Sequence, residues 1–239
     1  MARLLTVFAH PDDETFICGG ALARAAAEGH VVGLVCATLG EMGRRMGVPP
    51  IATRESLGAL REEELRSACT ALGIQDLRLL ALRDKTLEIV EPAALADRVR
   101  VEMAQFQPDA VITFHDVLGG HPDHCAIGAA TASAFDAYVA QDGDARLYAV
   151  AWAGTAQHLE ANGMRPEQWM TVDVRRHIGA KLAAFRAHRT QSGLNAWLWG
   201  AASDAAAHLG AVEHFIQLRA PFHRDATWFL PENPGRDRT

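Results

Sequence analysis

Short runs of apolar residues alternate along this chain with longer segments in which apolar residues recur every third or fourth position. The short runs are typical of buried strands, and the longer segments are typical of amphipathic helices. The runs predict strands at residues 4–9, 31–37, 77–82, 110–114, 146–152 and 171–174. The longer segments predict helices at residues 15–28, 54–72, 92–106, 122–139 and 178–188.

Strands that are apolar throughout and alternate with helices are typical of a parallel sheet that is covered on both faces. The sequence therefore predicts one α/β domain with a Rossmann-like, doubly wound, mostly parallel sheet. We expect its core over about residues 1–190 and a helix-and-loop region over about residues 191–230. The polar tail at residues 231–239 is predicted to be frayed. In such sheets, ligands bind beyond the carboxyl ends of the strands.

Composition and charge narrow the function classes. The 239 residues are 49% hydrophobic and 22% charged, and the net charge is −6, so no basic surface favours a nucleic-acid partner. The four cysteines show no CxxC spacing, which favours free thiols and a cytoplasmic location. The start of the chain lacks the pattern of a signal peptide, and no apolar run is long enough to span a membrane. The oligomeric state stays open, a homo-oligomer included.

The first motif that carries chemistry follows the first predicted strand and reads His10-Pro11-Asp12-Asp13-Glu14. His10 and Asp13 are separated by one turn, and imidazole and carboxylate are normal zinc ligands. Asp12 lies between them and is placed to accept a proton from a metal-activated water. Glu14 opens the next helix, where the helix dipole favours a negative charge, so we do not assign it as a ligand.

The second motif reads His121-Pro122-Asp123-His124 and opens the helix after the fourth predicted strand. The two histidines lie three residues apart on roughly one face, so that one can bind a metal while the other faces a substrate. Asp123 could orient an imidazole by accepting its second N–H. Two histidines and one aspartate would leave a coordination position open, as in catalytic zinc sites.

Either motif alone is typical of a turn or of helix capping. Both together, each at a strand end of an α/β pattern, favour a catalytic metal site.

The chain resembles the LmbE-like family, the superfamily of glucosaminyl-phosphatidylinositol de-N-acetylase (PIG-L). The resemblance covers most of the first 190 residues in order. It rests on both motifs and on further segments, namely Thr38-Leu39-Gly40-Glu41, Arg61-Glu62-Glu63-Glu64-Leu65, Arg83-Asp84 and Ala187-His188-Arg189-Thr190-Gln191.

The resemblance implies that His10, Asp13 and His124 bind zinc and that Asp12 is the general base. It makes His121 the imidazolium that stabilises the oxyanion or protonates the leaving amine, with Asp123 as its partner. Iron or cobalt could occupy the same ligands.

The resemblance also implies that Glu41, Arg61 and Asp84 lie near the hydroxyl groups or the polar tail of the substrate. Surface ion pairs remain an alternative for Arg61, and a turn remains one for Asp84. For His188 a partly buried position on a helix is the default. Some family members have a tyrosine where this chain has Gly119, so either His121 and the metal suffice to polarise the amide carbonyl or another group supplies the donor.

The sequence thus predicts a zinc-dependent deacetylase of an N-acetylglucosamine-type small molecule. Glycosides of thiol biosynthesis, such as N-acetylglucosaminyl malate or inositol, are the substrates that the resemblance suggests. An amidase for a larger thiol conjugate or another amide is the alternative within hydrolases. A nucleotide-binding protein is disfavoured because carboxylates stand where a dinucleotide fold needs glycines. A metal-binding module without catalysis is disfavoured by the presence of Asp12.

Overall fold

The computed structural model describes residues 1–142, 145–222 and 228–230. It forms one α/β domain around a seven-stranded, mostly parallel sheet in the order β3-β2-β1-β4-β5-β7-β6. The strands are β1 (Arg3–Phe8), β2 (Val31–Thr38), β3 (Asp76–Leu82), β4 (Ala110–Thr113), β5 (Arg146–Ala151), β6 (Trp169–Asp173) and β7 (Val212–Gln217). The predicted fold class is confirmed.

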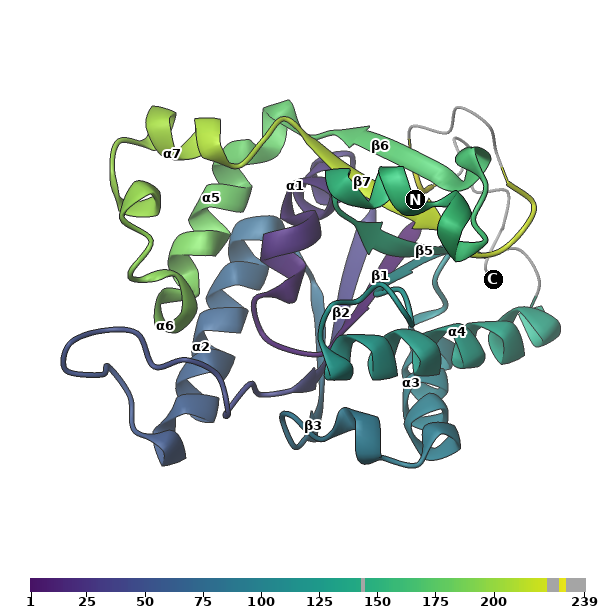
Figure 1. Ribbon diagram of the computed structural model, residues 1–239, viewed down its shortest axis with the longest axis horizontal. Coiled ribbons are helices and arrows are strands. Elements are labelled where there is room, and N and C mark those ends of the chain that lie inside the picture. Colours follow the sequence, from purple (N-terminus) through teal and green to yellow (C-terminus); the bar gives the residue numbers. More distant parts are fainter. Residues whose placement is uncertain (143–144, 223–227, 231–239) are drawn as a thin grey trace.

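Two layers of helices enclose the sheet (Figure 1). One layer holds α1 (Asp13–Ala27), α2 (Arg54–Leu72) and α5 (Ile178–Ala187), which contact one another. The other holds α3 (Pro92–Phe106) and α4 (Pro122–Asp142), which pack together. Two further helices, α6 (Arg189–Ser192) and α7 (Ala202–His208), follow α5. Short 3₁₀ turns lie at Leu87–Ile89, Ala153–His158, Glu160–Asn162, Pro166–Gln168, Arg175–His177 and Ala196–Trp199.

Local chemistry explains why two helix predictions match the observed bounds. Thr53 and Ser56 form a reciprocal capping box at the start of α2, and Gly73 ends that helix with a φ of +74°. Pro92 stands in the first turn of α3, where the Glu91 side chain accepts the Ala94 N–H at 2.8 Å. Both helices therefore carry their own start signals.

The antiparallel strand β7 is the element that the hydrophobic pattern does not predict. It lies between β5 and β6 and pairs antiparallel with both. Its sequence, Val-Glu-His-Phe-Ile-Gln, mixes polar and apolar residues, so it lacks the apolar run that marks the parallel strands. The sheet therefore extends beyond residue 190, and the predicted helix-and-loop region contributes a strand to it. The tail at residues 231–239, predicted to be frayed, lies outside the described residues.

The helix α1 is interrupted at Cys18, where φ is −136°. Just beyond the break, the N–H groups of Gly20 and Ala21 donate to the two carboxylate oxygens of Glu213 on β7, at 2.9 and 2.8 Å. Lys181 on α5 pairs with the same carboxylate at 2.6 Å, and both charged side chains are buried. Gly20 is required here, because an added Cβ would lie 2.6 Å from the Val174 side chain. This buried ion pair ties α1, α5 and β7 together.

No helix within the described ranges has both the length and the apolar character needed to cross a bilayer.

We predict that removing one partner of the Lys181–Glu213 pair destabilises the fold strongly, because an uncompensated charge stays buried. Lys181→Met should lower the free energy of unfolding by about 3–5 kcal/mol, as for other broken buried pairs. The double variant Lys181→Met/Glu213→Gln should recover part of this loss. Urea unfolding followed by circular dichroism measures the effect, and a Lys181→Met variant as stable as the parent would contradict it.

Candidate metal centre

Both histidine motifs lie at the point where the sheet reverses its strand order. The chain winds outward from β1 to β2 and β3, and then returns to place β4 on the other side of β1. Residues 9–14 follow β1, and residues 119–124 follow β4 after a loop. Because β1 and β4 are parallel neighbours, their carboxyl ends lie side by side. This switch point is where open α/β sheets bind their ligands.

Three potential metal donors converge there. His10 Nδ1 lies 3.2 Å from His124 Nε2 and 3.6 Å from Asp13 Oδ2, and His124 Nε2 lies 3.3 Å from Asp13 Oδ1. Four tetrahedral ligands at zinc distances are separated by about 3.3 Å, so the three atoms fit one face of such a site. The donor types, two imidazoles and a carboxylate, also suit zinc. The residues therefore fit the ion that the sequence predicts.

A second group of three, His10, His121 and Asp123, also lies close enough to hold an ion among the described residues. It is the weaker candidate because both Asp123 oxygens already accept backbone N–H groups. Lys85 donates to one at 2.8 Å and Leu87 to the other at 2.9 Å. We therefore take His10, Asp13 and His124 as the candidate ligands.

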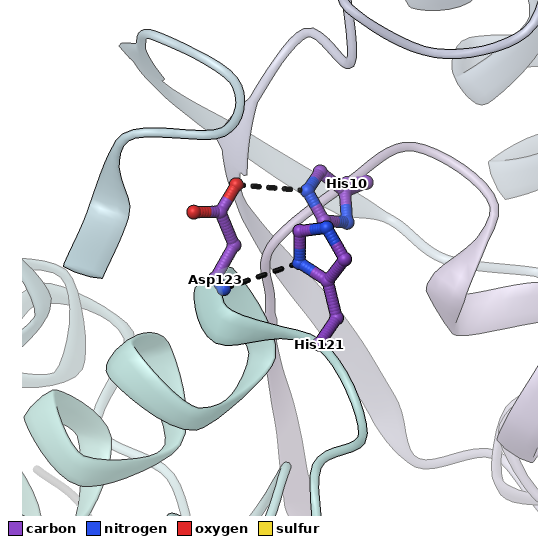
Figure 2. Close-up of side chains that lie close together, drawn as sticks. All are labelled: His10, His121 and Asp123. Carbon is purple, nitrogen blue, oxygen red and sulfur yellow. Dashed lines mark hydrogen bonds and ion pairs between the residues drawn. The ribbon is translucent and has the colours of Figure 1, made fainter.

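Two further carboxylates hold the far side of the His10 ring. His10 Nε2 lies 3.1 Å from Asp84 Oδ1 and 3.1 Å from Asp123 Oδ2. Figure 2 shows the Asp123 carboxylate pointing at His10, while only the backbone N–H of Asp123 contacts His121. Asp123 thus contacts a different histidine from the one expected. A carboxylate behind a metal-binding imidazole fixes the tautomer that presents the other nitrogen to the metal.

The carboxylates around the His10 ring favour a positive charge at this position. Burial alone would lower the pKa of His10, but hydrogen bonds with Asp123, Asp13 and Asp84 raise it to about 12. Burial likewise opposes the charge of Asp13, yet its contacts with His10 and His124 hold the pKa of Asp13 well below its usual range. Several carboxylates around one ring favour a positive charge in their midst, which a bound metal ion would also provide.

His124 is held from two sides. Its Nδ1 lies 2.9 Å from the Gly119 carbonyl oxygen, and its ring stacks on Phe114 with centroids 3.8 Å apart. The space at Gly119 is tight, because a Cβ there would lie 3.0 Å from both the His115 carbonyl oxygen and the His124 Cβ. The backbone around Gly119 therefore leaves little room for the tyrosine that some relatives carry at this position.

Asp12, the predicted base, occupies a strained backbone position. Its φ is 112°, a left-handed conformation that residues with a Cβ rarely adopt. Its carboxylate accepts from Arg61 Nη2 at 3.1 Å, and its side chain is 14% exposed. Burial raises the pKa of Asp12 to about 7, although the Arg61 guanidinium opposes the rise. A carboxyl group with a pKa near neutrality is well suited to general-base chemistry.

Arg61 is a buried residue and not a member of a surface ion pair. Besides Asp12, its guanidinium contacts the carbonyl oxygens of Pro11 and Gly40. Gly40 has a φ of +61° and no room for a Cβ against this guanidinium, which explains a glycine here. Arg61 thus holds the turn that carries the predicted base.

Of the three residues expected near the substrate, Arg61 and Asp84 line the pocket and Glu41 does not. Asp84 is buried against His10, and its second oxygen accepts the Met42 N–H at 2.8 Å. The Glu41 carboxylate accepts the Asp84 N–H at 3.0 Å. Glu41 and Asp84 therefore form a chain of contacts that ends at the His10 ring.

Glu14 and His188 form a buried pair behind Asp12 that the sequence does not predict. Glu14 Oε1 lies 2.6 Å from His188 Nε2, both side chains are fully buried, and Glu14 Oε2 accepts the Asp12 N–H at 3.0 Å. Burial by itself lowers the pKa of His188, but the Glu14 carboxylate raises it overall. The pair supports the strained backbone of Asp12 from behind. Both residues belong to segments on which the family resemblance rests, and this was the one sequence signal for the pair. Their separation by 174 residues means that no local pattern predicts the contact.

His121 stands at the open side of the site. Its Nδ1 accepts the backbone N–H of Asp123 at 3.1 Å, which leaves Nε2 as the protonated nitrogen of a neutral ring. Burial, and the neighbouring His10 and His124, lower the pKa of His121. The geometry therefore favours a neutral hydrogen-bond donor over the expected imidazolium.

A pocket of about 700 Å³ opens above these groups. Its floor holds the three candidate ligands with Asp12 and His121, and its wall includes Phe16, Met42 and Gln191. The volume lies within the range of small-molecule sites.

Comparison with known proteins places this site in a family. The family model described as "PIG-L: GlcNAc-PI de-N-acetylase" matches residues 5–135. A probable N-acetyl-alpha-D-glucosaminyl L-malate deacetylase 2 from Bacillus anthracis is 41% identical over 79% of this chain and 81% of the relative. A 1D-myo-inositol 2-acetamido-2-deoxy-alpha-D-glucopyranoside deacetylase 1 from Saccharopolyspora erythraea is 34% identical over 86% of this chain and 83% of the relative.

Among solved structures, GalB, a 4-carboxy-2-hydroxymuconate hydratase from Pseudomonas putida, superposes with a TM-score of 0.71. It is 20% identical, and the match covers 95% of this chain and all of GalB. At this identity the likeness concerns the fold alone, so the chemistry has to be argued from the site.

We predict that removing a candidate ligand and removing a carboxylate behind a ligand lower the zinc affinity to different degrees. His124→Ala removes a candidate ligand and should abolish stoichiometric zinc binding, whereas Asp84→Asn or Asp123→Asn should weaken zinc binding by about 10–100-fold, as for other residues behind metal ligands. His121→Ala should bind zinc like the parent, because His121 faces the pocket. Competition with a chromophoric chelator measures all four affinities, and a full loss of zinc in His121→Ala would support the alternative ligand group.

Proposed function

The chain belongs to the PIG-L (LmbE-like) family of N-deacetylases, and from this premise we propose that it is a zinc-dependent hydrolase for N-acetylglucosamine-type glycosides. The enzyme would remove the acetyl group from the sugar nitrogen and release acetate and a free amine. N-acetylglucosaminyl malate and N-acetylglucosaminyl inositol are the candidate substrates, because curated relatives at 41% and 34% identity are named for these deacetylations.

One observation carries the proposal: Asp12 lines the same accessible pocket as three converging metal donors and is adjacent in sequence to one of them, Asp13. A cluster of ligands without a base would favour a structural metal site, and a base without ligands would favour another reaction class. Their combination suits metal-assisted hydrolysis.

His10, Asp13 and His124 would hold the zinc ion. When bound, zinc would supply Lewis-acid polarisation of the acetamide carbonyl and lower the pKa of a water molecule. Asp84 and Asp123 would keep the His10 ring oriented with its Nδ1 toward the ion.

Asp12 would accept a proton from the attacking water as the water oxygen forms a bond to the acetamide carbon. The same carboxyl group would then donate this proton to the sugar nitrogen as the C–N bond breaks. Arg61 and the Glu14–His188 pair would keep the Asp12 carboxylate in place throughout. The reaction needs no other proton donor.

His121 would stabilise the developing negative charge on the acetyl oxygen through its Nε2–H. This donor would take the place of the tyrosine that is missing at Gly119. A neutral donor on the open side of the pocket is consistent with the lowered pKa of His121.

We predict that two variants both lose turnover but differ in their zinc content. Asp12→Ala should retain zinc but lose about 10²–10⁴-fold in kcat, the usual contribution of a general base. His124→Ala should lose both zinc and turnover. Metal analysis and acetate release from a panel of N-acetylglucosaminides measure the two properties, and full activity of Asp12→Ala would exclude Asp12 as the base.

A second prediction concerns metal removal. Dialysis against a chelator should abolish acetate release, and one equivalent of zinc per chain should restore it. Because the site suits other divalent ions, iron(II) or cobalt(II) should also restore activity to some degree. Acetate release that persists in the metal-free protein would overturn the proposed mechanism.

A further inference from the structure

Three cationic residues line the pocket above the candidate metal ligands. Arg44 lies in the segment between β2 and α2, Arg54 is the first residue of α2, and Lys85 follows β3. Within the ranges that the structure describes, these three side chains form no ion pair with a carboxylate, in contrast to Arg61 deeper in the same pocket. Cationic side chains without a carboxylate partner are available to an anionic ligand.

Hydrogen bonds hold each of these three residues in place. Arg54 Nη1 donates to the carbonyl oxygens of Glu41 and Gly43 at 2.8 and 3.0 Å. The carbonyl oxygen of Arg44 accepts from Gln191 Nε2 at 2.7 Å. The Lys85 N–H donates to Asp123 at 2.8 Å. The three residues are therefore anchored to the elements that build the metal centre.

Neither the carboxylates around the candidate metal ligands nor the neutral acetylated sugar would neutralise Arg44, Arg54 and Lys85. The carboxylates on the pocket floor face Arg61, His10, His124 and the position of the metal ion. An acetamide group and sugar hydroxyls are neutral, so binding them requires no cation. The surplus positive charge at the pocket wall would be matched by an anionic group on the rest of the substrate.

We propose that Arg44, Arg54 and Lys85 form a subsite for a carboxylate-bearing aglycone. The enzyme would then select anionic N-acetylglucosaminides over neutral ones with the same sugar. This inference rests on the proposed function, because it assumes that the acetamide occupies the metal centre. It distinguishes the two candidate substrates, since malate carries two carboxylates and inositol carries none.

The test compares three substrates: N-acetylglucosaminyl malate, its neutral dimethyl ester and N-acetylglucosaminyl inositol. Arg44→Gln and Lys85→Gln remove the charges, while Arg54 is left intact because it also holds loop carbonyls. Arg45→Gln is the matched control, since Arg45 is exposed, adjacent in sequence and not part of the pocket lining.

We expect the parent enzyme to have a KM for the malate glycoside that is at least about tenfold below those of the neutral substrates. The double variant Arg44→Gln/Lys85→Gln should raise the malate KM by about tenfold or more and leave kcat and both neutral substrates nearly unchanged. The malate KM of the parent should also rise with salt, because exposed charges are screened. Arg45→Gln should behave like the parent.

Two negative results are distinguishable. Acetate release from all three substrates, with KM values that the double variant shifts equally or not at all, would overturn the subsite and leave the proposed function intact. An absence of acetate release from every glycoside by the zinc-loaded parent would overturn the proposed function and the subsite together.

Discussion

The clustering of carboxylates around the His10 imidazole is the constraint on which the site depends. Asp84 and Asp123 hold one ring nitrogen, and Asp13 lies near the other. Such an arrangement is unfavourable without positive charge at its centre, so the protein creates a binding potential for a cation before any ligand arrives. The parallel pairing of β1 with β4 makes this possible, because it places two distant motifs at one edge of the sheet.

A second group of contacts surrounds Asp12, the proposed base. Arg61 on α2 and the Glu14–His188 pair approach Asp12 from different elements, and together they hold it in a conformation that it would not adopt alone. The rigidity of the scaffold thus offsets local strain at the residue where chemistry is proposed. GalB shares the fold at 20% identity and bears the name of a hydratase, so side chains at the sheet edge, and not the sheet itself, have to determine the reaction.

The sequence predicted what local patterns and short motifs encode. The parallel strands contain short apolar runs, α2 and α3 carry capping signals, and the two histidine motifs contain the donors that the structure brings together. It did not predict β7, whose residues mix polarity. It also places Asp84 near the substrate and Asp123 beside His121. In the structure both carboxylates contact His10, and Asp84 also lines the pocket. Neither β7 nor these contacts with His10 follow from a local pattern, since each is set by the tertiary packing of segments far apart in the chain.

The buried contacts of Glu14 and of the α1 break have a consequence for the folding of the chain during its synthesis on the ribosome. Their partners, His188 and Glu213, leave the ribosome long after the motif at residues 10–14. A nascent chain that has completed only the first parallel strands lacks the groups that complete α1 and support Asp12. We therefore expect the turn at Asp12 to reach its final conformation late, after β7 has inserted between β5 and β6. The order of synthesis would then delay the assembly of the proposed active site until all seven strands have paired.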